Sequence, residues 1–291
     1  MNHARVFIWS LAISCAIVPS ARAGDIVHRE EIRKTLTFSS PPGTARRLVV
    51  DNINGSIHVV GTNGTEATLV ARETFRAESE ERLSVAQEKI RLDVSSEPDR
   101  IMLYVDAPWR CADGSLSSRG HGNGWDYYGY DATFDFEIAV PARTDLFLKT
   151  VNGGEISVKN AEGSFRIENV NGGIVASGLN GSGTISTVNG NIEVRFAKNP
   201  AAASSFRTIN GKVDVSFQDD LSADLRLKTF NGQVYTDFQV ASLPPAPPAR
   251  PEHERKRVYR TSDSFKVRVG SGGPDLTFDT LNGNIYIVKN Q

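Results

Sequence analysis

Cysteine is nearly absent from this chain, which holds two among its 291 residues, Cys15 and Cys111. Cys15 falls within an apolar N-terminal run, so the remainder of the chain has one thiol and no internal disulfide is expected there. The fold must therefore be stabilised by packing and hydrogen bonds. Histidine is also scarce, with five residues, and no spacing of histidine and cysteine matches a zinc site.

An excess of positive charge is missing as well. The chain carries 33 Lys and Arg against 34 Asp and Glu, which gives a formal net charge of −1. A protein that binds nucleic acid needs clustered positive charge. Because acidic and basic residues alternate along the expected strands, we expect solvated faces and no nucleic acid among the partners.

The apolar runs are too short to span a bilayer, which takes about 20 residues. The run from Val6 to Val18 follows a basic start at Arg5 and precedes Ala21-Arg22-Ala23. This order of basic, apolar and small-x-small segments is typical of a secretory signal peptide. We expect residues 1–23 to be removed and the mature chain to be exported, periplasmic or extracellular on the cell surface, with no transmembrane segment. Lipidation at Cys15 is disfavoured, because apolar residues continue beyond it.

A tetrapeptide of Thr or Asn, an apolar residue, Asn and Gly recurs seven times. From the second copy to the sixth, its asparagines are 19, 18, 21 and 21 residues apart. Alternating apolar and polar residues flank the copies, which predicts strands with one buried face. We call each copy a corner. The corner asparagines are Asn54, Asn152, Asn171, Asn189, Asn210, Asn231 and Asn282.

Two architectures fit these corners. Asn-Gly is typical of a tight hairpin turn, so an antiparallel meander would show the same period. A hairpin does not require a threonine two positions before the asparagine, yet this threonine recurs in five copies. We therefore predict an all-β, parallel β-solenoid (β-helix-like) with stacked Thr-apolar-Asn-Gly corners, whose asparagine side chains bond from one corner to the next. The recurring threonines are Thr150, Thr187, Thr208, Thr229 and Thr280.

The corners, the Gly-rich segment before the strand expected at 132–140 and the Gly-rich segment 270–274 resemble the bacterial putative-adhesin β-repeat family. That family is similar to autotransporter-adhesin head-like domains and contains right-handed parallel β-solenoids. The resemblance spans roughly residues 48–288. It implies the fold and an envelope location, and it implies no catalytic residues.

The sequence pattern over residues 78–90 predicts one α-helix. Ser79 can cap its N-terminus, and Leu83, Ala86 and Ile90 form one apolar stripe. We expect this helix to cap an open end or face of the β-structure.

The segment 110–131 combines glycines with aromatic and acidic residues. Aromatic faces beside carboxylates and amides are what proteins use to hold sugar rings. The same composition fits a loop whose rings fold back onto the β-structure, and that is our first interpretation. Any ligand contact is expected from His121, Trp125, Asp126, Tyr127, Tyr128, Tyr130 and Asp131.

The chain is accordingly divided into three parts. A signal peptide (1–23) precedes an N-terminal β-rich part (24–145), which holds the helix and the Gly/aromatic loop. The β-solenoid repeats follow (146–291), with a Pro-rich insertion at 243–257 that explains the long step between the last two corners.

No catalytic motif is found. A nucleophile elbow and a phosphate-cradling loop are both missing from the sequence. The outward residues Glu155, Glu193 and Asp214 follow different corners and could approach one another. We expect a non-catalytic cell-envelope protein, adhesin-like or scaffolding, without metal or cofactor, whose partner is an envelope polysaccharide or a surface or periplasmic protein. The alternatives are a glycan-binding module using residues 121–131 and, third, a carbohydrate-active enzyme on a β-helix.

Overall fold

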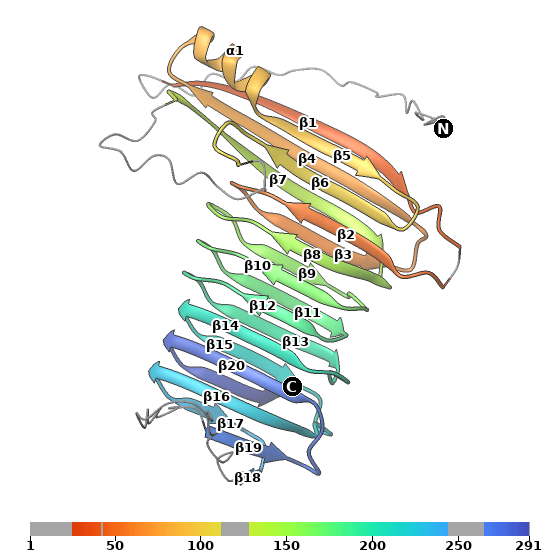
Figure 1. The fold of residues 1–291 in the computed structure, drawn as a ribbon, viewed down its shortest axis with the longest axis vertical. Coiled ribbons are helices and arrows are strands. Elements are labelled where there is room, and N and C mark those ends of the chain that lie inside the picture. The colour runs from red at the N-terminus through yellow and green to blue at the C-terminus, as the bar shows by residue number, and fades with distance from the viewer. Residues whose placement is uncertain (1–24, 42, 112–127, 244–264, 291) are drawn as a thin grey trace, which may run out of the picture.

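The computed structural model describes residues 25–41, 43–111, 128–243 and 265–290. The signal peptide expected at 1–23 lies outside the described residues. Two large sheets face each other along one elongated stack, with a short helix at the end that holds the first strands (Figure 1). No helix in the described ranges is long and apolar enough to cross a membrane.

The two sheets, A and B, contain ten and eleven strands. From the end with the first strands, sheet A consists of β1 (Ile26–Thr37), β4 (Glu66–Ala77), β7 (Tyr130–Pro141), β3 (Ile57–Thr62), β9 (Ile156–Lys159), β11 (Ile174–Asn180), β13 (Ile192–Lys198), β15 (Val213–Phe217), β21 (Ile285–Lys289) and β17 (Val234–Thr236). In the same direction, sheet B consists of β5 (Arg91–Ser96), β6 (Arg100–Asp106), β2 (Arg46–Asp51), β8 (Thr144–Lys149), β10 (Phe165–Glu168), β12 (Gly183–Ser186), β14 (Ser204–Asn210), β20 (Asp275–Asn282), β16 (Ala223–Asn231), β19 (Phe265–Val269) and β18 (Val240–Ser242).

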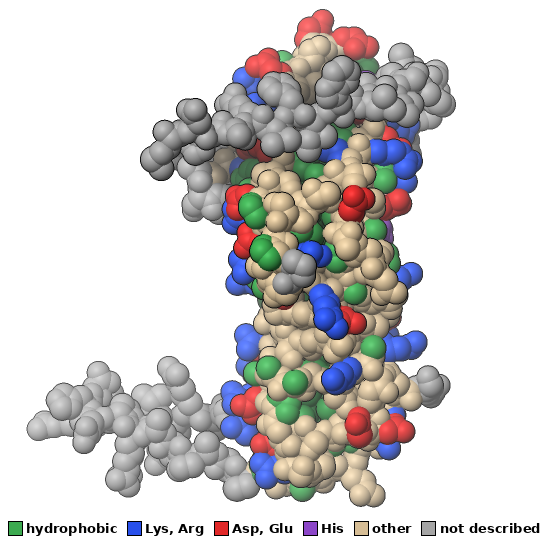
Figure 2. Space-filling view, turned by 90° about the vertical axis from the view of Figure 1, so that its right-hand side faces the viewer, with side chains coloured by type: hydrophobic (Ala, Val, Ile, Leu, Met, Phe, Trp, Pro, Cys, Tyr) green, Lys and Arg blue, Asp and Glu red, His purple; other side chains and the backbone are tan. Residues whose placement is uncertain are grey.

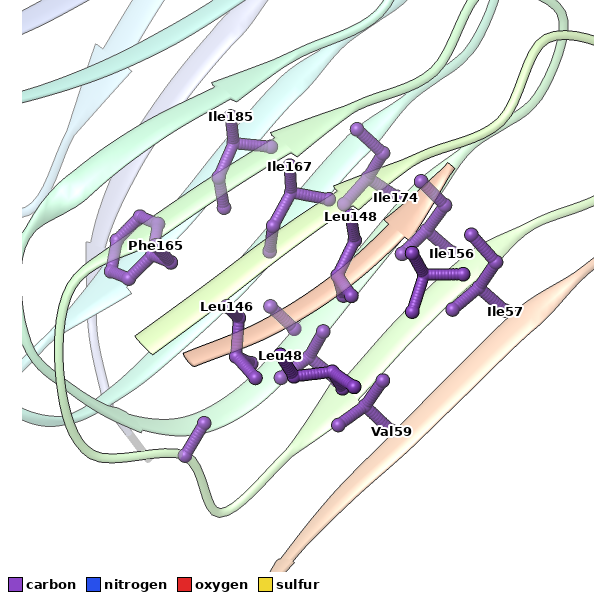
Figure 3. Close-up of a cluster of buried hydrophobic side chains, with 14 of the residues drawn as sticks. Leu48, Ile57, Val59, Leu146, Leu148, Ile156, Phe165, Ile167, Ile174 and Ile185 are labelled. Carbon is purple, nitrogen blue, oxygen red and sulfur yellow. The ribbon is translucent and has the colours of Figure 1, made fainter. Parts of the chain in front are cut away.

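The core lies between the sheets and follows from the two-residue alternation of each strand. Because the parallel strands pair in register, equivalent side chains form columns along the stack. One column of sheet A contains Ile57, Ile156, Ile174 and Ile192, all fully buried. Figure 3 shows part of this column with apolar side chains of sheet B, among them Leu148. Along the stack each strand pair is covered by its neighbours, so the two ends of the core need another cover.

The prediction of a parallel β-solenoid is wrong, because both sheets are mixed. Strands between the two ends pair in parallel, but β1, β4 and β7 are antiparallel, as are β5 and β6. At the other end, β19 runs antiparallel to both β16 and β18. A corner passes the chain from one sheet to the facing sheet. The antiparallel end strands are not joined to one another by corners, so the chain reverses there and pairs its strands antiparallel.

The corners also do not stack in the order of the sequence. The last corner, at Asn282, lies between those of Asn210 and Asn231, because β20 inserts between β14 and β16 and β21 between β15 and β17. The long step from Asn231 to Asn282 therefore contains β18 and β19 as well as the Pro-rich insertion. Residues 244–257 of that insertion lie outside the described residues.

The helix predicted over 78–90 is confirmed as α1 (Glu80–Lys89). The hydroxyl of Ser79 accepts a hydrogen bond from the Arg82 amide at 3.3 Å, which caps the helix. Its Leu83 is buried, and the helix packs against β4 and β7. It lies at the end of the stack where sheet A begins (Figure 1).

Candidate functional site

The corner asparagines form one continuous hydrogen-bonded column along an edge of the stack. Each bond joins the Nδ2 of one side chain to the Oδ1 of the next. The first asparagine, Asn54, donates to the carbonyl of Ala132 at 3.1 Å. The bonds are Asn152 to Asn54 (3.3 Å), Asn171 to Asn152 (2.7 Å), Asn189 to Asn171 (2.8 Å), Asn210 to Asn189 (2.8 Å), Asn282 to Asn210 (2.7 Å) and Asn231 to Asn282 (2.7 Å).

The threonine of the corner forms a second column beneath the asparagines. Its hydroxyl donates to the carbonyl of a glycine in the neighbouring corner, at 2.8–3.0 Å in all five cases. The amides of Asn52 and Asn169 make the equivalent bond in the other two copies, to Phe134 and Gly154. Threonine therefore recurs because it links corners, a role that an isolated hairpin does not offer.

Glycine is required at the corner by a close approach of neighbouring backbones. A Cβ on Gly190 would overlap the carbonyl oxygen of Gly172, and one on Gly211 would overlap that of Gly190. A type I′ hairpin would instead require positive φ at the asparagine as well. Among the described residues the non-glycine position with positive φ is Asn160, which is not a corner residue. The meander alternative is therefore excluded, since each corner joins strands of opposite sheets.

Replacement of Asn210 by alanine is expected to lower the free energy of unfolding by about 1–2 kcal/mol, because it removes two side-chain bonds at an exposed position. Urea unfolding of residues 24–291 measures this loss. Asn63→Ala, at an exposed site between β3 and β4, serves as the control. Equal stability of the two variants would show that the column contributes nothing.

The apolar residue of the corner becomes more exposed toward the C-terminal end of the stack. Ile53 in the first corner is 3% exposed, whereas Ile209, Leu281 and Phe230 in the last three corners are 44%, 46% and 70% exposed. This end of the corner edge thus presents apolar side chains to the solvent. Figure 2 views the opposite long edge of the stack, where charged side chains of both signs are scattered among uncharged ones.

The two sheets end at different levels beyond the last corner. Sheet A stops at β17, which has three residues, whereas sheet B continues with β19 and β18. A hollow of about 450 Å³ lies where sheet A lacks further strands. Phe265 and Val240 at this site are 50% and 44% exposed. The lining residues are Leu225, Leu227, Gln233, Val234, Thr236, Val240, Phe265, Val267 and Ile287.

Two stacked tyrosines stand on the outer face of sheet A beside this hollow. The rings of Tyr235 and Tyr286 are 5.0 Å apart and nearly parallel, at 8°. The hydroxyl of Tyr235 donates to Gln233, and that of Tyr286 accepts from Asn284 at 3.1 Å. Tyr235 and Tyr286 are register partners on β17 and β21, so the stacked pair reaches the edge of sheet A.

Of the three acidic residues expected from the sequence to approach one another, two do so. Glu193 and Asp214 are register partners, and the ammonium of Lys212 lies 2.8 Å and 3.4 Å from their carboxylates. The hydrogen bond with Glu193 raises the pKa of Lys212. Glu155 precedes its strand and does not join this row. The two carboxylates share the positive charge of Lys212, which favours a structural ion pair over a catalytic pair of carboxylates.

Three of the seven residues proposed as ligand contacts are described, and they lie far from the hollow, near α1. Tyr128 and Tyr130 form a ring cluster with Trp109, with centroids 5.5–6.4 Å apart. Asp131 is the register partner of Arg76, and burial raises the pKa of its carboxyl. His121, Trp125, Asp126 and Tyr127 lie outside the described residues.

Within the described ranges, no group of three or more His, Cys, Asp or Glu side chains could hold a metal ion. Sequence reasoning missed the apolar end of the stack. Its signal was present in Phe230, the one aromatic residue at the apolar corner position, followed by Tyr235.

No family model and no curated protein matches the chain. Among solved structures, it is similar to a "putative cell adhesion protein" from Clostridium sporogenes (TM-score 0.36, 11% identity, covering 90% of this chain and 100% of that one). It is also similar to a "putative adhesin" from Bacteroides fragilis (TM-score 0.31, 8% identity, 90% and 97% covered). A third is a "putative lipid binding protein" from Parabacteroides distasonis (TM-score 0.26, 9% identity, 90% and 97% covered).

Proposed function

We propose that this chain is an exported, non-catalytic envelope protein that binds a partner as an adhesin does, through the C-terminal end of its stack. One observation carries the proposal. Of the eight large apolar side chains exposed among the described residues, six lie at this end: Ile209, Phe230, Tyr235, Val240, Phe265 and Leu281. Apolar side chains that gather on a surface mark interaction sites.

The opposite end of the stack is covered, and this difference supports the same binding surface. There α1 packs against β4 and β7, and 12-residue strands extend sheet A. One end of the core is thus covered by the chain itself, while the other presents apolar side chains. Export is supported by the basic, apolar and small-residue order of residues 1–23.

Retention of envelope material on immobilised residues 24–291 tests the proposal, with purified envelope polysaccharide and envelope proteins as separate probes. The double variant Phe230→Ser/Phe265→Ser is expected to lose retention, because it removes apolar contact area at the exposed end. Val60→Ser/Val85→Ser, at the other two exposed positions, is the matched control. Equal retention by both variants would place the binding surface elsewhere, and release of cleaved polymer would contradict a non-catalytic role.

A glycan-binding module remains the second candidate, on the observation that Tyr128 and Tyr130 cluster with Trp109. The double variant Trp125→Ala/Tyr128→Ala should then release polysaccharide while leaving protein retention unchanged. Full retention of polysaccharide by this variant would rule the segment out as its site.

Export itself makes a separate prediction. When the full sequence is expressed in a Gram-negative host, the protein in the periplasm or medium is expected to begin at Gly24, as found by N-terminal sequencing. Ala21→Asp/Ala23→Asp should block this cleavage, because the processing enzyme requires small residues at these positions. An uncleaved protein that stays in the cytoplasm would contradict the proposal of export.

A further inference from the structure

The free edge of β17 is the one place where the geometry points to a particular kind of partner. We infer that it binds an extended segment of another protein, which adds to sheet A as a parallel strand and covers the hollow. The inference rests on the proposed adhesin-like function and names the chemistry of its partner. Three observations at the C-terminal end of the stack carry it.

The first observation is an edge without a strand partner. In the described part of the chain, β17 pairs with β21 alone and is the last strand of sheet A. The Ile285 amide donates to Gln233 and the Asp237 amide donates to Ile287, so alternate β17 residues face β21. The amides and carbonyls of Val234 and Thr236 therefore face away from it. Such an edge is a template for another strand.

The second observation is the apolar hollow beside this edge. A strand added to β17 would direct alternate side chains inward, toward Leu227, Phe265 and Val267 of sheet B. None of the residues that line the hollow carries a charge. The added segment must therefore carry uncharged, apolar residues at alternate positions. It would continue the interface that already joins the two sheets along the rest of the stack.

The third observation is that two columns end at this edge ready to be extended. Asn231 is the last asparagine of its column, and its amide already donates to Asn282. Tyr235 is the last ring of the stacked pair. An outward aromatic residue on the added strand could stack on Tyr235, and an amide could donate to Asn231. A sugar or an acyl chain would leave the main-chain edge of β17 unsatisfied, so a polypeptide fits best.

A peptide copied from residues 280–289 of this chain is a suitable probe, because β21 pairs in parallel with β17 in the structure. On the free edge of β17, its amides at Tyr286 and Val288 would face the protein, and those at Ile285 and Ile287 would face solvent. Fluorescence anisotropy with labelled peptide and residues 24–291 measures binding. Methylation of the nitrogens of Tyr286 and Val288 is expected to weaken binding about tenfold or more. Methylation at Ile285 and Ile287 is the matched control and should change it little.

Variants of the protein test the same edge from the other side. Thr236→Pro removes an amide that faces the free edge, and Phe265→Asp places a charge at the hollow. Each is expected to weaken the peptide about tenfold. Val60→Asp, at an exposed apolar position on β3 away from this edge, should leave peptide binding unchanged. Thermal unfolding of each variant confirms that the fold is kept, and the second variant decides if the first does not fold.

Three outcomes would overturn the inference. The peptide fails to bind residues 24–291, both methylated peptides bind equally, or the protein sediments as a dimer that Thr236→Pro converts to a monomer. The last outcome would make a second copy the occupant. If the peptide fails while envelope retention still depends on Phe230 and Phe265, the proposed function stands and the strand-addition inference alone is rejected.

Discussion

Replacement of Phe278 by alanine is expected to lower the free energy of unfolding by about 3–5 kcal/mol, through lost burial and a cavity that the rigid sheets cannot close. The ring is fully buried on β20. It stacks on Phe206 of the same sheet at 5.2 Å and meets Phe217 of the facing sheet edge-on at 6.3 Å. Because this ring anchors an inserted strand to both sheets, the loss should fall at the upper end of the range.

Urea unfolding of residues 24–291, followed by circular dichroism, measures this change. Phe230→Ala is the matched control, since it removes the same side chain from a position that is 70% exposed. The control is expected to change stability by no more than about 0.5 kcal/mol. A loss below about 1 kcal/mol for Phe278→Ala would mean that β20 does not occupy the centre of the stack.

Glu73 is expected to make the protein less stable as the pH rises from about 4.5 to about 7. Its side chain points inward on β4 and is 8% exposed, and burial raises its pKa from 4.5 to about 7. The nearby Glu30 raises this pKa further, and Lys34 lowers it. Between the two pKa values the folded chain holds a proton that the unfolded chain releases, so stability falls with pH. Above about 7 both states are ionised and the full penalty, up to about 3 kcal/mol, is present.

Glu73→Gln should remove this dependence, because the amide stays neutral at every pH. The variant is expected to exceed the native chain in stability by up to about 3 kcal/mol at pH 8 and to match it near pH 4. Urea unfolding at pH 4, 6 and 8 gives both curves. Glu66→Gln, exposed on the same strand, is the control. Parallel curves for native and Glu73→Gln protein would show that this carboxyl is solvated in the folded state.

The sequence was sufficient to identify the corners, because each one repeats the same four-residue pattern. Asn210 and Thr208 recur at fixed offsets since each must reach the neighbouring corner. The helix at 80–89 was also predictable from its cap and apolar stripe. Both features leave a short, local pattern in the sequence, although the bonds of the corners join residues far apart along the chain.

The direction and order of the strands were not predictable in the same way. The alternation of apolar and polar residues within β4 is the same for parallel and antiparallel pairing, so it does not indicate that the sheets are mixed. The corner at Asn282 carries the same residues as the others, and nothing in it indicates a place between Asn210 and Asn231. The apolar end was missed because its members come from corners and from separate strands, among them Phe265 on β19.

The insertion of β20 and β21 between earlier pairs constrains the order in which the chain folds. Strands β16 and β17 come before their permanent neighbours in the chain, and they cannot pair with β14 and β15 without occupying the wrong place. Contacts of such long sequence separation form slowly. Until residues 275–289 are in place, the folding chain therefore carries an unfinished β-edge that other polypeptides can capture, which makes this stage the natural point for a chaperone to act.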